Sequence, residues 1–120
     1  MYQVIVVIRN FANNYFSSKM TKEELAKEQE QLARFAKALG HPVRIAILQM
    51  LAQKVCCYHS NMSEMLPIAK STLSQHLKEL KEAGLISQEV VTLPTIKYCI
   101  DKKNWALAKE LFDKLFIAPV

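Results

Sequence analysis

The amino-acid sequence predicts a mainly α-helical fold with one small β-hairpin, and three features indicate it. First, residues 71–83 carry leucines at helical spacing. Second, a Gly-His-Pro break at residues 40–42 precedes another apolar segment, which is typical of a helix that starts at a proline. Third, the sequence after Gly84 changes to two short runs of β-branched and aromatic residues, which indicates a hairpin.

The predicted helix that ends before Gly84 is the most informative element, because its two faces differ in chemistry. Leu73, Leu77 and Leu80 are spaced i, i+4 and i+7, so we expect them to anchor the helix to a core. Ser71 is the expected N-cap, and Gly84 is the expected C-terminal stop. The outward face carries hydroxyl, amide and ammonium groups suited to base edges and phosphates, from Ser71, Thr72, Ser74, Gln75 and Lys78. We call this element the reading helix; an ordinary amphipathic surface helix is the alternative.

The other elements are predicted from the same kinds of signal. We expect further helices over residues 21–39, 42–54, 62–67 and 104–116, and strands over residues 85–91 and 95–100. Helix, short helix, reading helix and hairpin, in that order, are typical of a winged helix-turn-helix.

Three stretches of the sequence resemble one known family: LGHPVRIAIL at residues 39–48, STLSQHLKELKEAGLI at residues 71–86 and YCID at residues 98–101. They are similar to the ArsR/SmtB family of bacterial metal- and metalloid-sensing repressors, over about residues 32–115. The resemblance implies a homodimeric, cytoplasmic repressor that leaves its double-stranded operator DNA when an inducer binds.

The two ends of the chain differ from its middle. Thr21 and Glu24 form a capping box, so we expect ordered structure to begin near Met20. We expect residues 1–19 to form a flexible N-terminal extension, and Met20 is a candidate start of the protein. Residues 20–120 are then the winged helix-turn-helix domain for DNA binding and dimerisation. The last helix carries a wide apolar arc, and together with the first helix it is the expected dimer surface; a helix buried within a monomer is the alternative.

Composition agrees with a nucleic-acid partner and gives no support for an enzyme. Sixteen basic and eleven acidic side chains give a net charge of +5, which favours attraction to a polyanion. The chain has only two glycines and no phosphate-cradling loop or Ser-His-Asp grouping. The apolar run at residues 4–8 is too short to span a membrane, so we expect no membrane partner. A winged-helix module that binds another protein is the alternative function.

Three residues outside the outward face of the reading helix, or at its edge, are also predicted to contact DNA. His76 matches the Ser-x-His-Leu run of the family, and we expect it to contact a phosphate or to have a structural role. Arg44 is expected to reach a phosphate or to form an intramolecular salt bridge. Lys97 lies in the wing, whose turn at residues 92–95 has little charge and no glycine. The reading helix is therefore expected to supply most of the specificity.

Three cysteines form the candidate inducer site. Residues 55–58 have strand character, so we expect them to pair with residues 97–100 and to bring Cys99 close to Cys56 or Cys57. Neighbouring side chains on a strand point to opposite faces, so a regular strand turns only one of the adjacent thiols toward Cys99. All three converge only if a bulge or loop interrupts the strand.

If the three thiols converge, the site suits soft ions, and we expect trivalent arsenic or antimony as the inducer, with no constitutive cofactor. Lys54 and Lys97 would favour the thiolates. Zinc held by cysteines and His59 is a less favoured alternative, because the last helix lacks the histidines that zinc sensors of the family use. The adjacent pair also departs from the Cys-x-Cys arsenic motif of the family. Two alternatives to metalloid binding remain. The cysteines could form a disulfide in response to oxidants or sulfur species, or they could have a purely structural role as small buried side chains.

Overall fold

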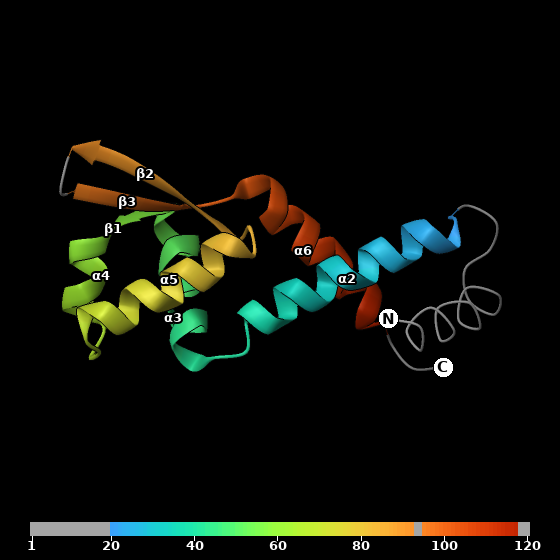
Figure 1. Ribbon diagram of the computed structural model, residues 1–120, viewed down its shortest axis with the longest axis horizontal. Coiled ribbons are helices and arrows are strands. Elements are labelled where there is room, and N and C mark those ends of the chain that lie inside the picture. Colours follow the sequence, from blue (N-terminus) through green and yellow to red (C-terminus); the bar gives the residue numbers. More distant parts are fainter. Residues whose placement is uncertain (1–19, 93–94, 118–120) are drawn as a thin grey trace. The chain divides into compact units, whose positions relative to one another are not determined.

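The computed structural model describes residues 20–92 and 95–117, and it confirms the predicted winged helix-turn-helix. Its elements are α2 (Lys22–Ala38), α3 (Pro42–Lys54), β1 (Cys56–Tyr58), α4 (His59–Met65), α5 (Lys70–Glu82), β2 (Ile86–Thr92), β3 (Thr95–Ile100) and α6 (Lys102–Leu115). In Figure 1 the β2–β3 hairpin projects from the group formed by α3, α4 and α5. The predicted extension at residues 1–19 and the centre of the predicted wing turn, residues 93–94, lie outside the described residues.

The described part of the chain divides into two compact units, one that ends at Arg34 and one that begins at Phe35. In the first unit, α2 begins with the predicted capping box. The amide of Glu24 donates to Thr21 Oγ1 at 3.1 Å, and the amide of Thr21 donates to Glu24 Oε2 at 3.0 Å. Two amides that the first helical turn leaves without backbone partners are thereby satisfied.

The core of the second unit joins apolar side chains from the end of α2 through β2. Leu73, Leu77 and Leu80 of α5 are completely buried, as their spacing predicts. They are buried together with Phe35, Ile47, Leu51, Met62 and Leu85. Because every element between α2 and β2 contributes to this core, the orientation of α5 is set by the whole unit.

The predicted hairpin is part of a three-stranded antiparallel sheet with the order β1-β3-β2. Its two long strands begin and end within one residue of the predicted bounds. The third strand, β1, follows α3 directly and pairs along β3, as expected for residues 55–58. A register irregularity lies between Val90 and Thr92 of β2. Helix α4 packs against both β1 and β3.

Two predicted helix boundaries are confirmed. Pro42 begins α3, where its missing amide hydrogen costs nothing, and His41 caps this helix by accepting a bond from the amide of Val43 at 3.1 Å. Gly84 follows α5 with φ of 85°, in the left-handed region that favours glycine. A Cβ at Gly84 would also lie 2.7 Å from Asn104 Nδ2, so a side chain there would be strained by the backbone conformation and would require the Asn104 side chain to shift.

Three other predicted boundaries were wrong. The N-cap of α5 is Ala69, which offers no side-chain bond, and Ser71 lies inside the first turn instead. The short helix α4 begins three residues earlier than predicted, directly after β1, and it ends before the extended residue Leu66. Helix α6 begins at Lys102 because Asp101 Oδ1 accepts a bond from the amide of Asn104 at 3.0 Å, an N-cap that the apolar pattern does not reveal.

The apolar arc predicted for α6 is only partly buried within the described chain. Ala108 and Leu111 are buried, whereas Trp105, Leu115 and Phe116 are 37%, 56% and 76% exposed. None of the described helices is both long and apolar enough to cross a membrane.

Candidate DNA interface and thiol pair

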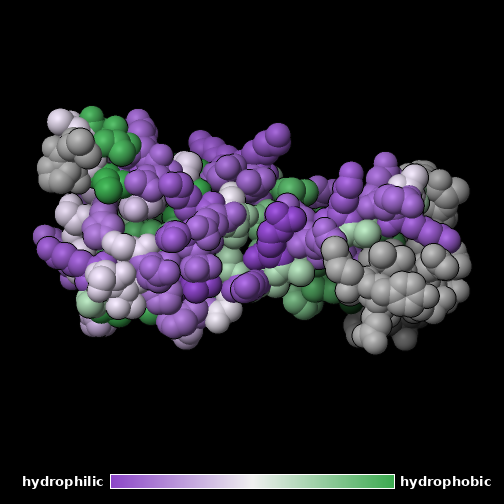
Figure 2. Space-filling model, viewed as in Figure 1, coloured by the Kyte–Doolittle hydropathy of each residue, from purple (hydrophilic) through white to green (hydrophobic). Residues whose placement is uncertain are grey.

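The outward face of α5 presents the polar groups that the sequence predicts. Ser71, Thr72, Ser74, Gln75 and Lys78 are all exposed, while the leucines between them are buried. In the view of Figure 2 the surface over α5 is mostly hydrophilic. A helix that is held by one face and carries hydroxyl, amide and ammonium groups on the other is suited to the major groove of DNA.

One of these exposed groups already has a partner from another element. Ser74 Oγ lies 3.1 Å from Nε2 of His59, the first residue of α4. The His59 ring also lies 6.3 Å, centroid to centroid, from the ring of Tyr98 in β3. His59 therefore contacts both the sheet and the outward face of α5. No sequence signal predicts this contact, because it depends on where α4 begins.

Arg44 and His76, both predicted to contact DNA, bind each other. Arg44 Nε donates to His76 Nδ1 at 3.1 Å, and Arg44 Nη1 donates to the carbonyls of Lys37 and Ala38 at the end of α2, at 3.5 and 3.4 Å. The His41 ring lies 4.3 Å from the His76 ring. Arg44 thus joins the end of α2 to the reading helix by hydrogen bonds, in place of the salt bridge considered as its alternative.

The protonation of His76 follows from these neighbours. Burial lowers the pKa of His76 below its ordinary value of 6.5, and the charges of His41 and Arg44 lower it further against the opposing carboxylate of Glu79. Since Nδ1 accepts the bond from Arg44, the neutral ring carries its hydrogen on Nε2. His76 is therefore fixed in one tautomer by Arg44.

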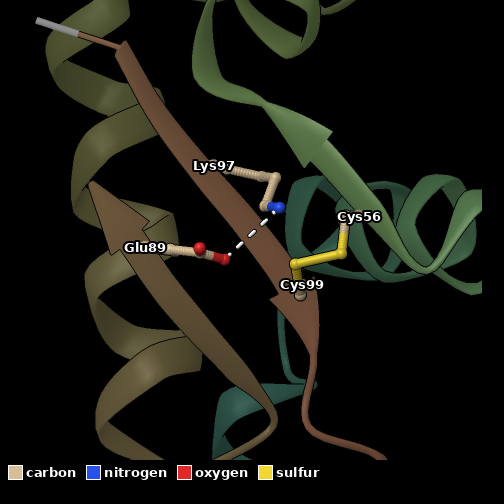
Figure 3. Close-up of a disulfide and its surroundings, with 4 residues drawn as sticks. All are labelled: Cys56, Glu89, Lys97 and Cys99. Carbon is tan, nitrogen blue, oxygen red and sulfur yellow. Dashed lines mark ion pairs between the residues drawn. A yellow bond between two sulfur atoms is a disulfide. The ribbon is translucent and has the colours of Figure 1, made fainter. Parts of the chain in front are cut away.

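The hairpin is attached to α5 and contains an ion pair across its two strands. Lys81 Nζ of α5 donates to Gln88 Oε1 of β2 at 3.0 Å. Lys97 of β3 lies opposite Glu89 of β2, and their charged atoms are 3.3 Å apart, as Figure 3 shows. The ammonium group of Lys97, which is predicted to contact DNA, is thus paired with a carboxylate of the wing.

The apolar residues near the end of the hairpin are exposed. Val90 and Val91 of β2 are 54% and 50% exposed, and Figure 2 shows an apolar patch where the hairpin projects. The two valine side chains themselves carry no hydrogen-bonding group for a base edge.

Cys56 and Cys99 form a disulfide between β1 and β3 (Figure 3). The two residues are register partners. The amide of Ile100 donates to the carbonyl of Val55 at 2.8 Å, which makes residues 55 and 100 a hydrogen-bonded pair. The two kinds of pair alternate along an antiparallel ladder, so Cys56 and Cys99 form the non-hydrogen-bonded kind, in which Cα atoms come closest. Register alone therefore places these two sulfurs together.

Cys57 does not join them, because no bulge interrupts β1, and the predicted three-cysteine site of Cys56, Cys57 and Cys99 is therefore not formed. Cys57 is buried and free, and its thiol donates to the carbonyl of Tyr58 at 3.6 Å. Since β1 is regular at this point, Cys57 points to the face opposite that of Cys56. No group of three or more His, Cys, Asp or Glu side chains placed to hold a metal ion is present among the described residues. The thiol pair, defined as Cys56 and Cys99, is what the fold brings together.

A family model described as a helix-turn-helix domain matches residues 39–89. The chain is 29% identical over 97 residues to the biofilm growth-associated repressor of Xylella fastidiosa, covering 81% of each chain. It is 32% identical over 66 residues to the HTH-type transcriptional regulator YgaV of Escherichia coli, covering 55% of this chain and 67% of that one. It is 42% identical over 53 residues to the transcriptional repressor SmtB of Mycobacterium tuberculosis, covering 44% and 38%.

Solved structures share the fold. A possible transcriptional regulator for arsenical resistance superposes with a TM-score of 0.63 and 28% identity, over 73% of this chain and 85% of that one. An ArsR family transcriptional regulator superposes with a TM-score of 0.63 and 21% identity, over 72% and 88% of the two chains. These relatives are transcriptional regulators, and the matched helix-turn-helix domain contains the whole reading helix.

Proposed function

This chain belongs to the ArsR/SmtB family of transcriptional repressors, and we propose that formation of the Cys56–Cys99 disulfide is the signal that releases it from operator DNA. The observation that carries this proposal is the register of β1 on β3, which brings these two sulfurs within bonding distance and excludes Cys57. Cys99 lies in β3 of the wing, Cys56 lies in the neighbouring strand β1, and the wing connects to α5 through the hydrogen bond from Lys81 to Gln88.

The chemical step is a two-electron oxidation of the thiol pair by a hydroperoxide. One thiolate attacks the peroxide oxygen and becomes a sulfenic acid, while the other oxygen leaves with a proton as water or an alcohol. The second thiol then displaces hydroxide from that sulfur, which forms the disulfide and releases water. Two sulfurs are oxidised and one peroxide is reduced. Cytoplasmic thiols would reverse the step by exchange.

DNA binding is proposed to use a homodimer, as the resemblance implies. The exposed apolar side chains of α6 offer a surface that a second copy could cover. Paired α5 helices would then enter major grooves about one helical turn apart. Thr72, Ser74, Gln75 and Lys78 would contact base edges and phosphates, with Ser71 at the phosphates near the helix start.

Fluorescence anisotropy on DNA from upstream of the protein's own gene tests this proposal. We expect tight binding by the reduced protein, steep loss of affinity with rising salt, and release after stoichiometric hydrogen peroxide. A hundredfold release corresponds to about 2.7 kcal/mol, within the usual range of allosteric coupling.

Cys99→Ser should bind DNA but should not be released by peroxide. Cys57→Ser is the matched control, and peroxide should release it from DNA as it releases the parent. Release of Cys99→Ser by peroxide would contradict the proposal. Binding that is weak, salt-insensitive and without sequence preference would favour a protein-interaction module instead.

Trivalent arsenic or antimony is a second candidate signal, since the same two thiols could bridge a soft ion when reduced. The observation in its favour is the 28% identity to a structure described as a regulator for arsenical resistance. Arsenite added to the reduced protein distinguishes the two signals, because it needs no oxidant. Release by arsenite from the parent and from Cys57→Ser, but not from Cys99→Ser, would support this candidate. Zinc is less favoured, since His59, its proposed imidazole ligand, contacts Ser74 instead.

A further inference from the structure

One side chain connects the strand of Cys56 with the outward face of α5. β1 ends at Tyr58 and α4 begins at the next residue, so only Cys57 and Tyr58 separate Cys56 from His59. From this position His59 reaches Ser74 Oγ, 3.1 Å from its Nε2. Among the described residues of β1 and α4, His59 alone makes a side-chain hydrogen bond to α5.

We propose that His59 is a positioning residue: the disulfide between Cys56 and Cys99 holds it against Ser74, and it thereby makes the outward face of the reading helix depend on the oxidation of the thiol pair. In the disulfide form, which the structure describes, His59 engages the hydroxyl of Ser74. This occupies a group that would otherwise be available to DNA, and it ties the outward face of α5 to the start of α4, directly after β1. The inference rests on the proposed function, since it names the route by which oxidation at Cys56 and Cys99 changes DNA binding.

The placement of β1 makes this route sensitive to the disulfide. β1 has three residues and lies at the edge of the sheet, where only β3 pairs with it. A strand this short makes few ladder hydrogen bonds, so the covalent bond is a large part of what fixes it on β3. When the bond is absent, β1 and the start of α4 gain freedom to shift, and His59 moves with them.

The other end of the contact is rigid. Ser74 follows the buried Leu73 and precedes the buried Leu77 on a helix whose inner face is completely buried. A movement of β1 therefore changes the distance between His59 and Ser74 more than it changes the position of Ser74 itself. The Tyr98 ring, buried on β3 beside His59, limits the directions in which the imidazole can move.

The experiment measures DNA affinity of the full chain in reduced and peroxide-oxidised forms, for the parent, His59→Ala and His59→Gln. The readout is the ratio of the two dissociation constants, which a merely structural defect would not selectively change. For the parent we expect a ratio of about a hundred. His59→Ala should bind DNA within about twofold of the parent when reduced, but its ratio should fall by about tenfold or more. Gln, whose amide can reach Ser74, should restore most of the ratio.

A parent-like ratio in His59→Ala would overturn the inference and leave the proposed function intact. Equal weakening of both forms would also overturn it, because His59 would then serve folding or DNA binding in general. A parent without any response to peroxide would overturn the proposed function and the inference together. If His59→Ala folds poorly, nitrogen-15 NMR of the parent imidazole gives a second test. The Nε2 resonance should shift on reduction, and an unchanged resonance would overturn the inference.

Discussion

The reading helix and the thiol pair differ in how firmly the fold holds them. α5 is anchored by three completely buried leucines and joined to α3 through His76 and Arg44. The thiol pair lies between a three-residue edge strand and its single neighbour, and both cysteines are partly exposed. DNA reading needs groups in constant positions, whereas sensing needs a region that one chemical event can change. If the proposed function holds, the molecule separates these two requirements between a packed helix and a short edge strand.

Removing a core side chain from α5 should give the largest effect. Leu77→Ala deletes a completely buried side chain and leaves a cavity, so we expect the free energy of unfolding to fall by about 2–5 kcal/mol. Urea denaturation of the reduced protein measures the change. Lys78→Ala, at the exposed neighbour, is the matched control and should change stability by less than about 0.5 kcal/mol. Equal effects of the two substitutions would contradict the assignment of the buried face.

Reducing the disulfide should be the next largest effect on stability. The bond joins residues separated by 43 positions. Closing a loop of that length in the unfolded chain should stabilise the fold by about 2–4 kcal/mol. Urea denaturation with and without reductant measures the difference, and Cys99→Ser should be indifferent to reductant. We expect the loss to be concentrated around β1, so hydrogen exchange should rise there more than in α5. An equal rise in hydrogen exchange in β1 and in α5 on reduction would contradict the view that the fold holds α5 more firmly than the thiol pair.

A substitution on the outward face of α5 should leave the fold unchanged and alter DNA reading. Gln75 is exposed, and its side chain points away from the buried leucines of the same helix. Gln75→Ala should cost about 1–3 kcal/mol on the preferred operator if the amide makes a bidentate base contact, and much less on unrelated DNA. Competition anisotropy with the two DNAs measures the difference. A loss of equal size on both would assign Gln75 to the phosphate backbone instead.

The two regions also differ in how far the sequence predicts them. The faces of α5 follow from a spacing of three and four residues, so the helix alone predicts Leu73, Leu77 and the outward polar groups. The pairing of residues 55–58 with residues 97–100 is predicted as well, because strand character is local. Which cysteine faces Cys99 could not be predicted, since it depends on a register that a shift of one residue would reverse.

The contacts of single side chains are the least predictable. Ser71 has the side chain of a good N-cap, but α5 begins at Lys70, so the cap position lies two residues earlier than predicted, at Ala69. The bond between His59 and Ser74 depends on the start of α4 immediately after β1. Arg44 is predicted to reach DNA or to form a salt bridge, and the fold gives it an imidazole and two carbonyls. Each of these outcomes depends on packing between elements, which spacing along one element does not describe.

The junction between α3 and α5 should respond to pH, with the smallest of the expected effects because His76 is only partly buried. Its pKa is lowered in the folded protein by burial first, and then by the charges of His41 and Arg44. The unfolded chain therefore binds more protons than the folded chain between the lowered value and about pH 6.5. The stability that this group contributes is fully present above pH 6.5, and it is lost as pH falls through the lowered pKa. Protonation of Nδ1 would also remove the acceptor of the Arg44 bond, so α5 should lose part of its attachment over the same range. Urea denaturation between pH 5 and pH 8 measures the slope, and His76→Gln should flatten it. A parent slope unchanged by this substitution would assign the pH dependence to other groups.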